Sequence, residues 1–157
     1  MIHIKVIAVG KLQRMYQLIQ EEFVKRLSRY ARAEILEVAD EPAPEKLSAA
    51  QKDGVMLAEW EKIRKKIGTG DFVVVLDASG KKCSSEELAV SLGKWQENRC
   101  ITFVLGGSLG LYHEALNSAD EVLSLSDMTF THSMARTILL EQLYRGFKIN
   151  TSDPYHK

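Results

Sequence analysis

Short apolar runs alternate with longer segments of helical periodicity along this chain of 157 residues. The runs 2–9, 72–76 and 101–105 are rich in β-branched residues, and the last two are almost wholly apolar, as in strands buried on both faces. Between them apolar residues recur at intervals of three and four, as in 13–30. This alternation predicts an α/β fold with a mainly parallel sheet flanked by helices. A chain of this length suits a single domain, 1–157.

The remaining elements follow from turn and capping residues. We expect further strands at 35–38 and 122–125, and helices at 48–67, at 84–96, after the glycine turn near 106, and from Thr131 or Ser133 onward. Two polar segments, 40–45 and 77–82, are expected to be loops, the first because two prolines interrupt it.

Composition excludes several classes of protein. Lysine plus arginine and aspartate plus glutamate number 21 each, so net charge gives no argument for a nucleic-acid partner. Cys83 and Cys100 have no metal-binding or redox spacing, which suits a reducing compartment. No segment is typical of a signal peptide or a membrane span. We therefore expect a cytoplasmic protein without a metal and without a membrane partner.

Basic residues are concentrated near the first predicted helix. Between positions 11 and 32 only Glu21 and Glu22 oppose the set Lys11, Arg14, Lys25, Arg26, Arg29 and Arg32. Such a surface suits a phosphate backbone, although a solvated helix face has the same composition.

A glycine-rich turn, Gly106–Gly110, follows the strand at 101–105, and no lysine or arginine occurs between Arg99 and Arg136. Glycines let the backbone approach a ligand closely, and phosphate sites at such turns usually add a basic side chain. The turn also lacks the dinucleotide pattern and the P-loop lysine. The sequence therefore favours a neutral or cationic ligand, with a tight connection as the alternative.

Three predicted strand ends carry distinctive residues: Leu76-Asp77, Gly106-Gly107 and the segment 124–130. In a parallel sheet, ligands bind at the carboxyl ends of strands near a switch in strand order. If these strands are neighbours, their loops form one crevice. His132 lies beside the third loop. Its role there is either that of a structural hydrogen-bonding residue or that of a base.

Residues near the C-terminus leave two interpretations open. Glu141 and Arg145, four residues apart, suit an ordinary ion pair within a helix. Tyr155, His156 and Lys157 combine a ring, a titratable group and a cation, which suits contact with an RNA base. A frayed terminus is the alternative.

Six segments together resemble the RlmH family, SPOUT-class methyltransferases of large-subunit ribosomal RNA in bacteria. They occur in order over the whole chain: IHIKVIAVGKL, VVVLDASGK, FVLGGSLGL, SLSDMTFTH, LLEQLYRGFKI and PYHK. One departure is Thr131, where relatives usually have proline; threonine can cap the helix, but the loop before it is expected to be less rigid.

The resemblance implies a C-terminal trefoil knot, a homodimer, and S-adenosylmethionine as cofactor. It implies methylation of N3 of a pseudouridine in 23S rRNA of the assembled ribosome. Matched position by position, the cofactor contacts fall on Leu76, Gly106, Leu125, Ser126, Asp127, Met128, Thr129 and Phe130. The residues expected to assist at the acceptor base are Tyr155 and His156.

These features lead to one hypothesis and two rivals. We expect direct displacement of the methyl group by the base nitrogen, with His156 as proton acceptor and His132 in reserve. The rivals are a non-catalytic RNA- or ribosome-binding module of the same fold, and a nucleotide-binding enzyme acting on phosphate esters. A surplus of apolar residues on the last helix, such as Leu139, Leu140 and Leu143, predicts a two-fold interface there.

Overall fold

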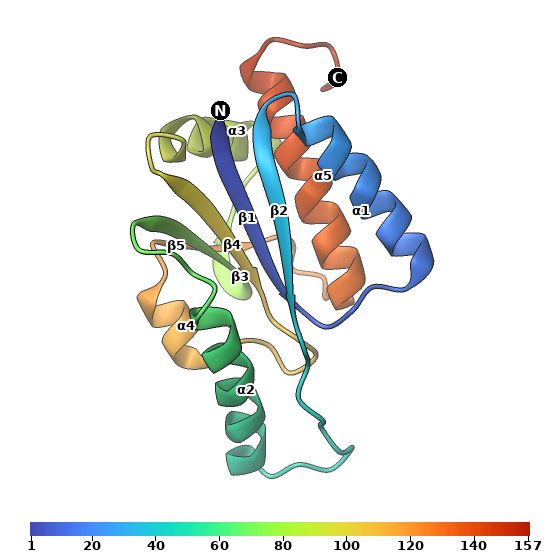
Figure 1. Cartoon of the computed structure of the whole chain (residues 1–157), viewed down its shortest axis with the longest axis vertical. Helices are drawn as coiled ribbons and strands as arrows, with labels where there is room; N and C mark the ends of the chain where they lie inside the picture. Colours follow the sequence, from blue (N-terminus) through green and yellow to red (C-terminus); the bar gives the residue numbers. More distant parts are fainter.

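A five-stranded parallel sheet forms the centre of the protein, with strand order β2-β1-β4-β3-β5 (Figure 1). The computed structural model describes residues 1–157. The strands are β1 (Ile2–Val9), β2 (Ala31–Val38), β3 (Asp71–Lys82), β4 (Cys100–Leu105) and β5 (Glu121–Ser124). The expected α/β class and parallel sheet are thus confirmed, whereas the trefoil knot stays a prediction.

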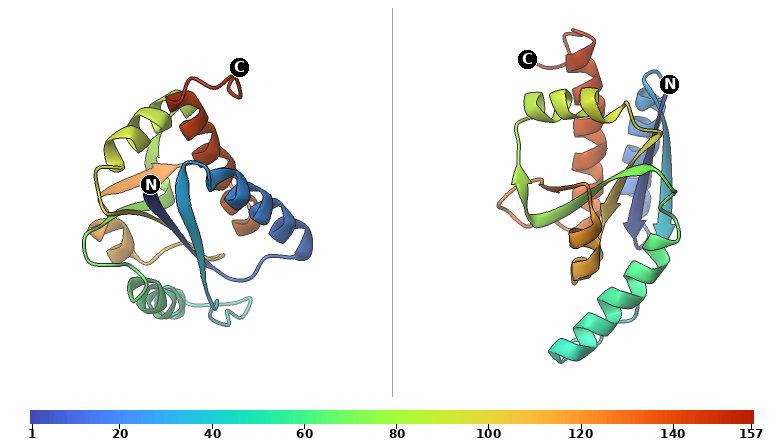
Figure 2. Two further views of the ribbon diagram at one scale, coloured as in Figure 1. Left: turned by 45° about the horizontal axis from the view of Figure 1, so that its top comes forward. Right: turned by 90° about the vertical axis from the view of Figure 1, so that its left-hand side faces the viewer.

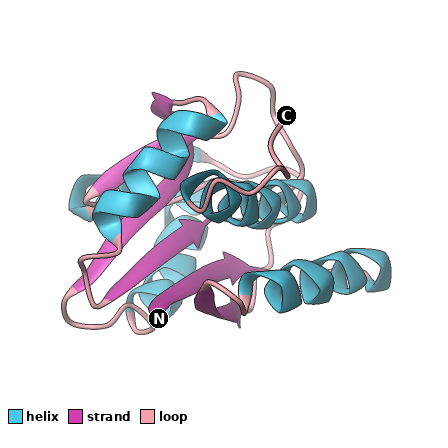
Figure 3. Ribbon diagram, turned by 90° about the horizontal axis from the view of Figure 1, so that it is seen from above, coloured by secondary structure: helices cyan, strands magenta, loops and turns pink.

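Helices cover both faces of the sheet (Figures 2 and 3). The helices are α1 (Arg14–Leu27), α2 (Ala49–Arg64), α3 (Ser85–Trp95), α4 (His113–Ser118) and α5 (His132–Asn150). One buried cluster joins α1, α3 and α5 to the sheet, and a second, smaller cluster joins α2 and α4 to the opposite face. None of these helices is both long and apolar enough to cross a membrane.

Alternation along the strands explains the two clusters. In β1, Ile4, Val6 and Ala8 belong to the larger cluster, and Ile7 and Val9 to the smaller one. Successive strand side chains point to opposite faces, so a strand covered on both sides must be apolar at nearly every position. This is the pattern by which the sequence revealed β1 and β4.

Side-chain caps mark the beginning of three helices, α2, α3 and α5. Ser48 and Gln51 form a capping box at the start of α2, and Ser84 and Glu87 form another at the start of α3. At the start of α5 the hydroxyl of Thr131 accepts a hydrogen bond from the amide of Met134 at 3.3 Å. These bonds satisfy amides that the first helical turn leaves without partners.

Two strands are longer than expected. β2 begins at Ala31, because its first half pairs with β1 although Arg32 and Glu34 are polar. β3 continues to Lys82, so the predicted loop 77–82 is wrong. Its register against β5 shifts between Leu76 and Lys81. At Gly80, a Cβ would lie 2.5 Å from the backbone of β5, so only glycine fits there.

Candidate active site

One cavity of about 620 Å³ lies where the carboxyl ends of β4, β3 and β5 meet. These strands are neighbours in the sheet, so the three loops converge as expected. The cavity is lined by every residue that the sequence associates with the cofactor: Leu76, Gly106, Leu125, Ser126, Asp127, Met128, Thr129 and Phe130. Their contact with a cofactor stays a prediction.

The glycine turn after β4 forms one wall of the cavity. A Cβ at Gly106 would lie 2.8 Å from the carbonyl carbon of Gly110 and from the side chain of Leu111. Gly110 has φ +84°, and its amide donates to the carbonyl of Gly107 at 3.1 Å. The two ends of the turn therefore approach each other too closely for any side chain at Gly106.

The segment after β5 forms the facing wall and is held by its own serines. The hydroxyl of Ser124 donates to the carbonyl of Ser126 at 3.0 Å, and the amide of Met128 donates to the hydroxyl of Ser126 at 3.0 Å. The side chain of Met128 is 76% exposed. This wall thus offers backbone groups and one exposed apolar side chain to a ligand.

Basic side chains are absent from the cavity lining, which contains the carboxylates Asp77 and Asp127. Lys82 forms an ion pair with Asp127, and both side chains are more than half exposed. Arg136, the first basic residue after the gap in the sequence, is 1% exposed. It donates to Glu37 at 2.8 Å and to the carbonyl of Gly10 at 3.1 Å, so its charge is balanced outside the cavity. The lining favours a cation over a phosphate.

A buried carboxyl lies behind the glycine turn. Glu59 of α2 is 5% exposed, and a Cβ at Gly107 would lie 3.2 Å from its Oε1. Its Oε2 accepts a hydrogen bond from the amide of Glu41 at 3.0 Å. Burial raises the pKa of Glu59 above its ordinary value, although that hydrogen bond acts in the opposite direction.

The C-terminal residues fold back onto the last turns of α5 and contact α3 (Figure 1). Tyr155 donates its hydroxyl to Glu141 at 3.2 Å, and the guanidinium of Arg145 lies 4.9 Å from the centroid of its ring. Burial, followed by the carboxylate of Glu141, raises the pKa of Tyr155. Asp153 forms an ion pair with Lys148. The frayed terminus considered from the sequence is therefore wrong.

His156 is held between two charged groups. Its Nδ1 lies 3.2 Å from Nη1 of Arg145, and its Nε2 lies 2.8 Å from Oε1 of Glu86 on α3. An arginine only donates, so Nδ1 accepts its hydrogen bond. Nε2 then carries the hydrogen and donates it in a hydrogen bond to Glu86. The hydrogen bond from His156 lowers the pKa of Glu86. In this arrangement the lone pair on Nδ1 of His156 is engaged by Arg145.

The cavity and the terminal residues lie at opposite ends of α5. His132, at the start of the helix, lines the cavity, whereas Tyr155 and His156 contact its last turns. A helix of 19 residues spans roughly 28 Å at about 1.5 Å per residue. The structure therefore does not bring the expected catalytic pair to the cavity of its own chain.

Two other expectations need correction. The apolar surplus of α5 is used within the chain, because Leu139, Leu140 and Leu143 are buried against α1, α3 and the sheet. The basic residues between positions 11 and 32 also do not form one surface. Arg32 lies on β2 and faces away from α1, because its neighbours Ala31 and Ala33 take the side of the larger cluster.

Several residues of the site were not selected from the sequence. Asp77 and Ser124 line the cavity, as expected from their positions at two of the three strand ends, although neither was among the expected cofactor contacts. Glu86 lies in the first turn of α3, where an acidic residue has an ordinary helix-stabilising role, yet it also contacts His156. Glu141 and Arg145 form the expected ion pair, but Glu141 also accepts from Tyr155, a contact that no local pattern indicates.

Comparisons with known proteins agree with this geometry. A family model described as predicted SPOUT methyltransferase matches residues 2–156. A protein of Acetivibrio thermocellus named ribosomal RNA large subunit methyltransferase H is 50% identical over 98% of this chain and 99% of its own. A protein of Clostridioides difficile with the same name is 46% identical over 99% of both.

A solved structure shares the fold. It is that of a probable methylase family protein from Haemophilus influenzae Rd KW20, with a TM-score of 0.55 and 15% sequence identity. The match covers 98% of this chain and 70% of the other. With the family match over nearly the whole sequence, the chain belongs to the SPOUT methyltransferases, among the proteins named ribosomal RNA large subunit methyltransferase H.

Proposed function

We propose that the protein transfers a methyl group from S-adenosylmethionine to N3 of a pseudouridine in 23S rRNA of the assembled ribosome. The observation that carries the proposal is the single cavity at the carboxyl ends of β4, β3 and β5, with a lining free of lysine and arginine. The names of the relatives, which act on large-subunit ribosomal RNA, support the choice of substrate.

The cavity fits the chemistry of this cofactor. Its volume of about 620 Å³ is in the range of small-molecule sites. Asp77, which forms no ion pair, supplies negative charge for a ligand that carries a sulfonium and an ammonium group, whereas Asp127 is paired with Lys82. Backbone groups of Gly106 and of the segment 125–130 are available to an adenine edge. When bound, the cofactor supplies a methyl group already activated for transfer.

The residues of the chain then have to orient the acceptor base and remove its proton. An imino nitrogen is protonated at neutral pH, so a nearby base accelerates the transfer. His156 is the proposed acceptor, once its Nδ1 leaves Arg145, and His132 at the cavity is the reserve. Tyr155 is proposed to stack on the nucleotide or to donate to it.

A homodimer would bring the two parts together. Within one chain α5 separates His156 from the cavity, so we propose that the terminal residues of one protomer reach the cavity of the other. Exposed apolar residues for an interface occur on α1, at Leu18 and Ile19, and on α5, at Met134. The two helices are neighbours, as the contact between Gln20 and Arg136 shows. Lys157 and the basic residues of α1 would then contact phosphates.

The decisive experiment is mass mapping of ribosomal RNA from cells with and without this protein. Loss of one methyl group from one pseudouridine of 23S rRNA is the expected result, restored by the purified protein with S-adenosylmethionine and ribosomes. Unchanged RNA, together with ribosome binding but no heat on titration with S-adenosylmethionine, would instead identify a non-catalytic binding module.

A further inference from the structure

On the face that carries α2 and α4, no helix covers the amino-terminal half of the sheet. Arg32 of β2 is exposed there, whereas Cys100 and the Asp71 side chain of the neighbouring strands are buried. In the strands, residues of this face are apolar where α2 and α4 cover them, as at Ile7, Val75 and Val104. Towards the amino ends the same face becomes polar. One row crosses four strands in register, with Arg32 beside His3, His3 beside Cys100, and Cys100 beside Asp71.

A second hollow, of about 450 Å³, lies over this row. His3, Lys5, Thr69, Asp71 and Arg99 contribute to its lining. It is at the amino ends of the strands, whereas the candidate active site is at their carboxyl ends. The two hollows share no residue, so the second is not an extension of the first.

The acidic groups of the hollow are already paired. Nζ of Lys5 donates to Asp71 at 3.0 Å and to the carbonyl of Lys66 at 3.1 Å. Although burial opposes ionisation, hydrogen bonds from Thr102, from the Gly68 amide and from Lys5 hold the pKa of Asp71 below its ordinary value. Glu34 lies 3.2 Å from His3. Both carboxylates are therefore occupied within the protein.

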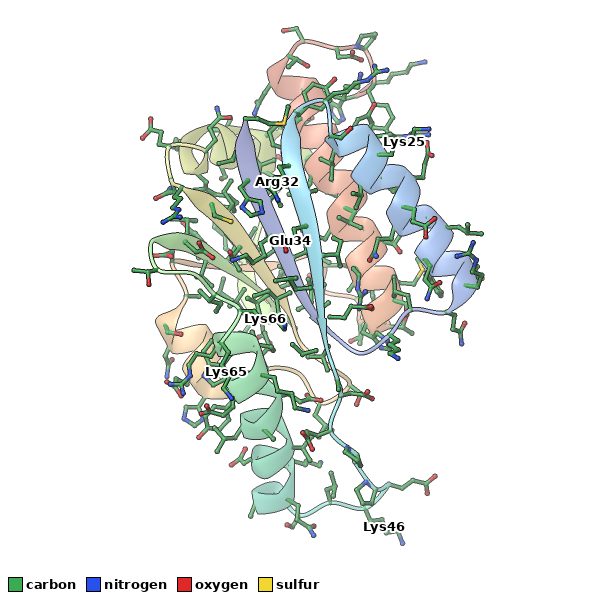
Figure 4. The ribbon with its side chains drawn as sticks, viewed as in Figure 1. Lys25, Arg32, Glu34, Lys46, Lys65 and Lys66 are labelled. Atoms are coloured by element: carbon green, nitrogen blue, oxygen red, sulfur yellow. The ribbon has the colours of Figure 1, made fainter.

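The cations around the hollow are not occupied in this way. Arg32, Lys65, Lys66 and Arg99 take part in no ion pair, unlike Lys5 beside them or Arg64 on α2. Arg32, Lys65 and Arg99 are exposed. Arg32, Lys65 and Lys66 are labelled in Figure 4, where Arg32 lies on the sheet and both lysines at its border, at the end of α2. The surface thus carries a surplus of free positive charge.

We propose that this open half of the sheet is a second RNA-contact surface, on which Arg32, Lys66 and Arg99 bind the phosphodiester backbone. The inference rests on the proposed function, because a ribosomal substrate supplies the polyanion that complements the surface. Arg32 and the basic residues of α1 lie on opposite faces of the sheet. Two such surfaces suit a folded RNA that surrounds the protein on more than one side.

The polar row also explains why the sheet stays open here. Strand faces that helices cover are apolar, whereas Arg32 and Glu34 in β2 would lose hydration beneath a helix. An open sheet face exposes side chains in fixed positions, which suits recognition of a surface with regular charge spacing. RNA contact therefore explains the polar residues in this half of β2, which do not contribute to the core.

The test is the salt dependence of ribosome binding by a triple variant, Arg32→Gln, Lys66→Gln and Arg99→Gln. The matched control removes three cations elsewhere, Lys46→Gln, Lys52→Gln and Lys94→Gln; Lys46 lies at the far end of the molecule (Figure 4). We expect affinity to fall at least about tenfold, and the slope of log K against log salt to become shallower by about 2 units.

Affinity for S-adenosylmethionine and kcat at saturating ribosomes should match those of the control, while KM rises. Equal affinities and slopes for the two triple variants would overturn the proposal. So would a variant that loses only stabilisation by inorganic phosphate, since the hollow would then be a small-anion site. These binding slopes do not depend on turnover; a wild-type protein that binds ribosomes but methylates nothing would contradict the proposed function instead.

Discussion

The two ends of α5 differ in how they are built. At its start, the candidate active site is made of backbone turns with apolar and small polar side chains and two carboxylates, and its lining has no lysine or arginine. At its end, Glu141, Arg145, Tyr155 and His156 form a network of charged and polar groups that extends to Glu86. The first arrangement suits a small cation, and the second suits proton transfer and RNA contact. The proposed cofactor site and the proposed proton-transfer and RNA-contact groups therefore lie at opposite ends of one helix.

Removal of the imidazole at the far end should have the largest effect. For His156→Ala we expect single-turnover methylation of ribosomes to fall by about 100- to 10,000-fold, the usual contribution of a general base. The affinity for S-adenosylmethionine should not change, because His156 does not line the cavity. His113→Ala, at an exposed histidine of α4, is the matched control. If His156→Ala lost affinity for S-adenosylmethionine as strongly as it lost methylation, the two ends of α5 would not be independent.

A side chain introduced into the glycine turn should disturb only the cavity at the start of α5. Gly106→Ala places a Cβ 2.8 Å from backbone that must then move, so we expect methyl transfer to fall by about 100-fold and cofactor binding to weaken. Gly54→Ala, in α2, has no atom within 4 Å of the new Cβ and serves as control. Calorimetry with S-adenosylmethionine measures the difference. Wild-type affinity in Gly106→Ala would exclude the turn from the site.

Mixing the two inactive variants tests whether the ends meet across a dimer. If the terminal residues act on the partner's cavity, co-refolded Gly106→Ala and His156→Ala chains form mixed dimers in which one of two sites is intact. Activity should return to about a quarter of the wild-type value. Each variant alone should stay inactive under the same treatment. No recovery in proven mixed dimers would place both parts of the site in a single chain.

The smallest effect concerns the buried carboxyl behind the glycine turn. Because the pKa of Glu59 is raised, the folded protein binds its proton more strongly than the unfolded chain does. The free energy of unfolding therefore falls as pH rises from the ordinary glutamate pKa through the raised value. Glu59→Gln removes this fall, and we expect about 1 kcal/mol of added stability at neutral pH.

Thermal unfolding at several pH values measures that contribution. The expected gain in Tm is about 2–4 °C at neutral pH, and it should vanish near the ordinary glutamate pKa. Glu45→Gln, at an exposed position, should change neither the Tm at neutral pH nor its dependence on pH. A loss of stability in Glu59→Gln at neutral pH would mean that the ionised carboxylate itself supports the turn.

The sequence predicted the cavity better than the terminal network, and the reason is physical. The glycine turn and the segment after β5 are local, and a parallel sheet brings strand ends to one edge whatever their order in the chain. The contact between Glu86 and His156 joins residues 70 positions apart and leaves no periodic signal. The residue types of Tyr155 and His156 suggested contact with an RNA base, but only the resemblance to a known family gave them a role at the acceptor base.

The errors in strand length have a similar cause. Hydrophobic periodicity detects the parts of a strand that helices cover, so the polar first half of β2 escaped detection. The extension of β3 to Lys82 depends on pairing with β5, a partner about 40 positions later in the chain. Both segments, the first half of β2 and the end of β3, lie in parts of the sheet that helices do not cover on both faces.

The continuity of α5 also restricts how this sequence can change in length. One residue inserted or deleted within the helix would rotate everything beyond it by about 100° and shift it by about 1.5 Å. Tyr155 would then leave the ring of Tyr144, and His156 would leave Glu86, while the cavity at the start of the helix stayed intact. Length variation is therefore expected in loops such as 39–47, and α5 should keep its number of residues.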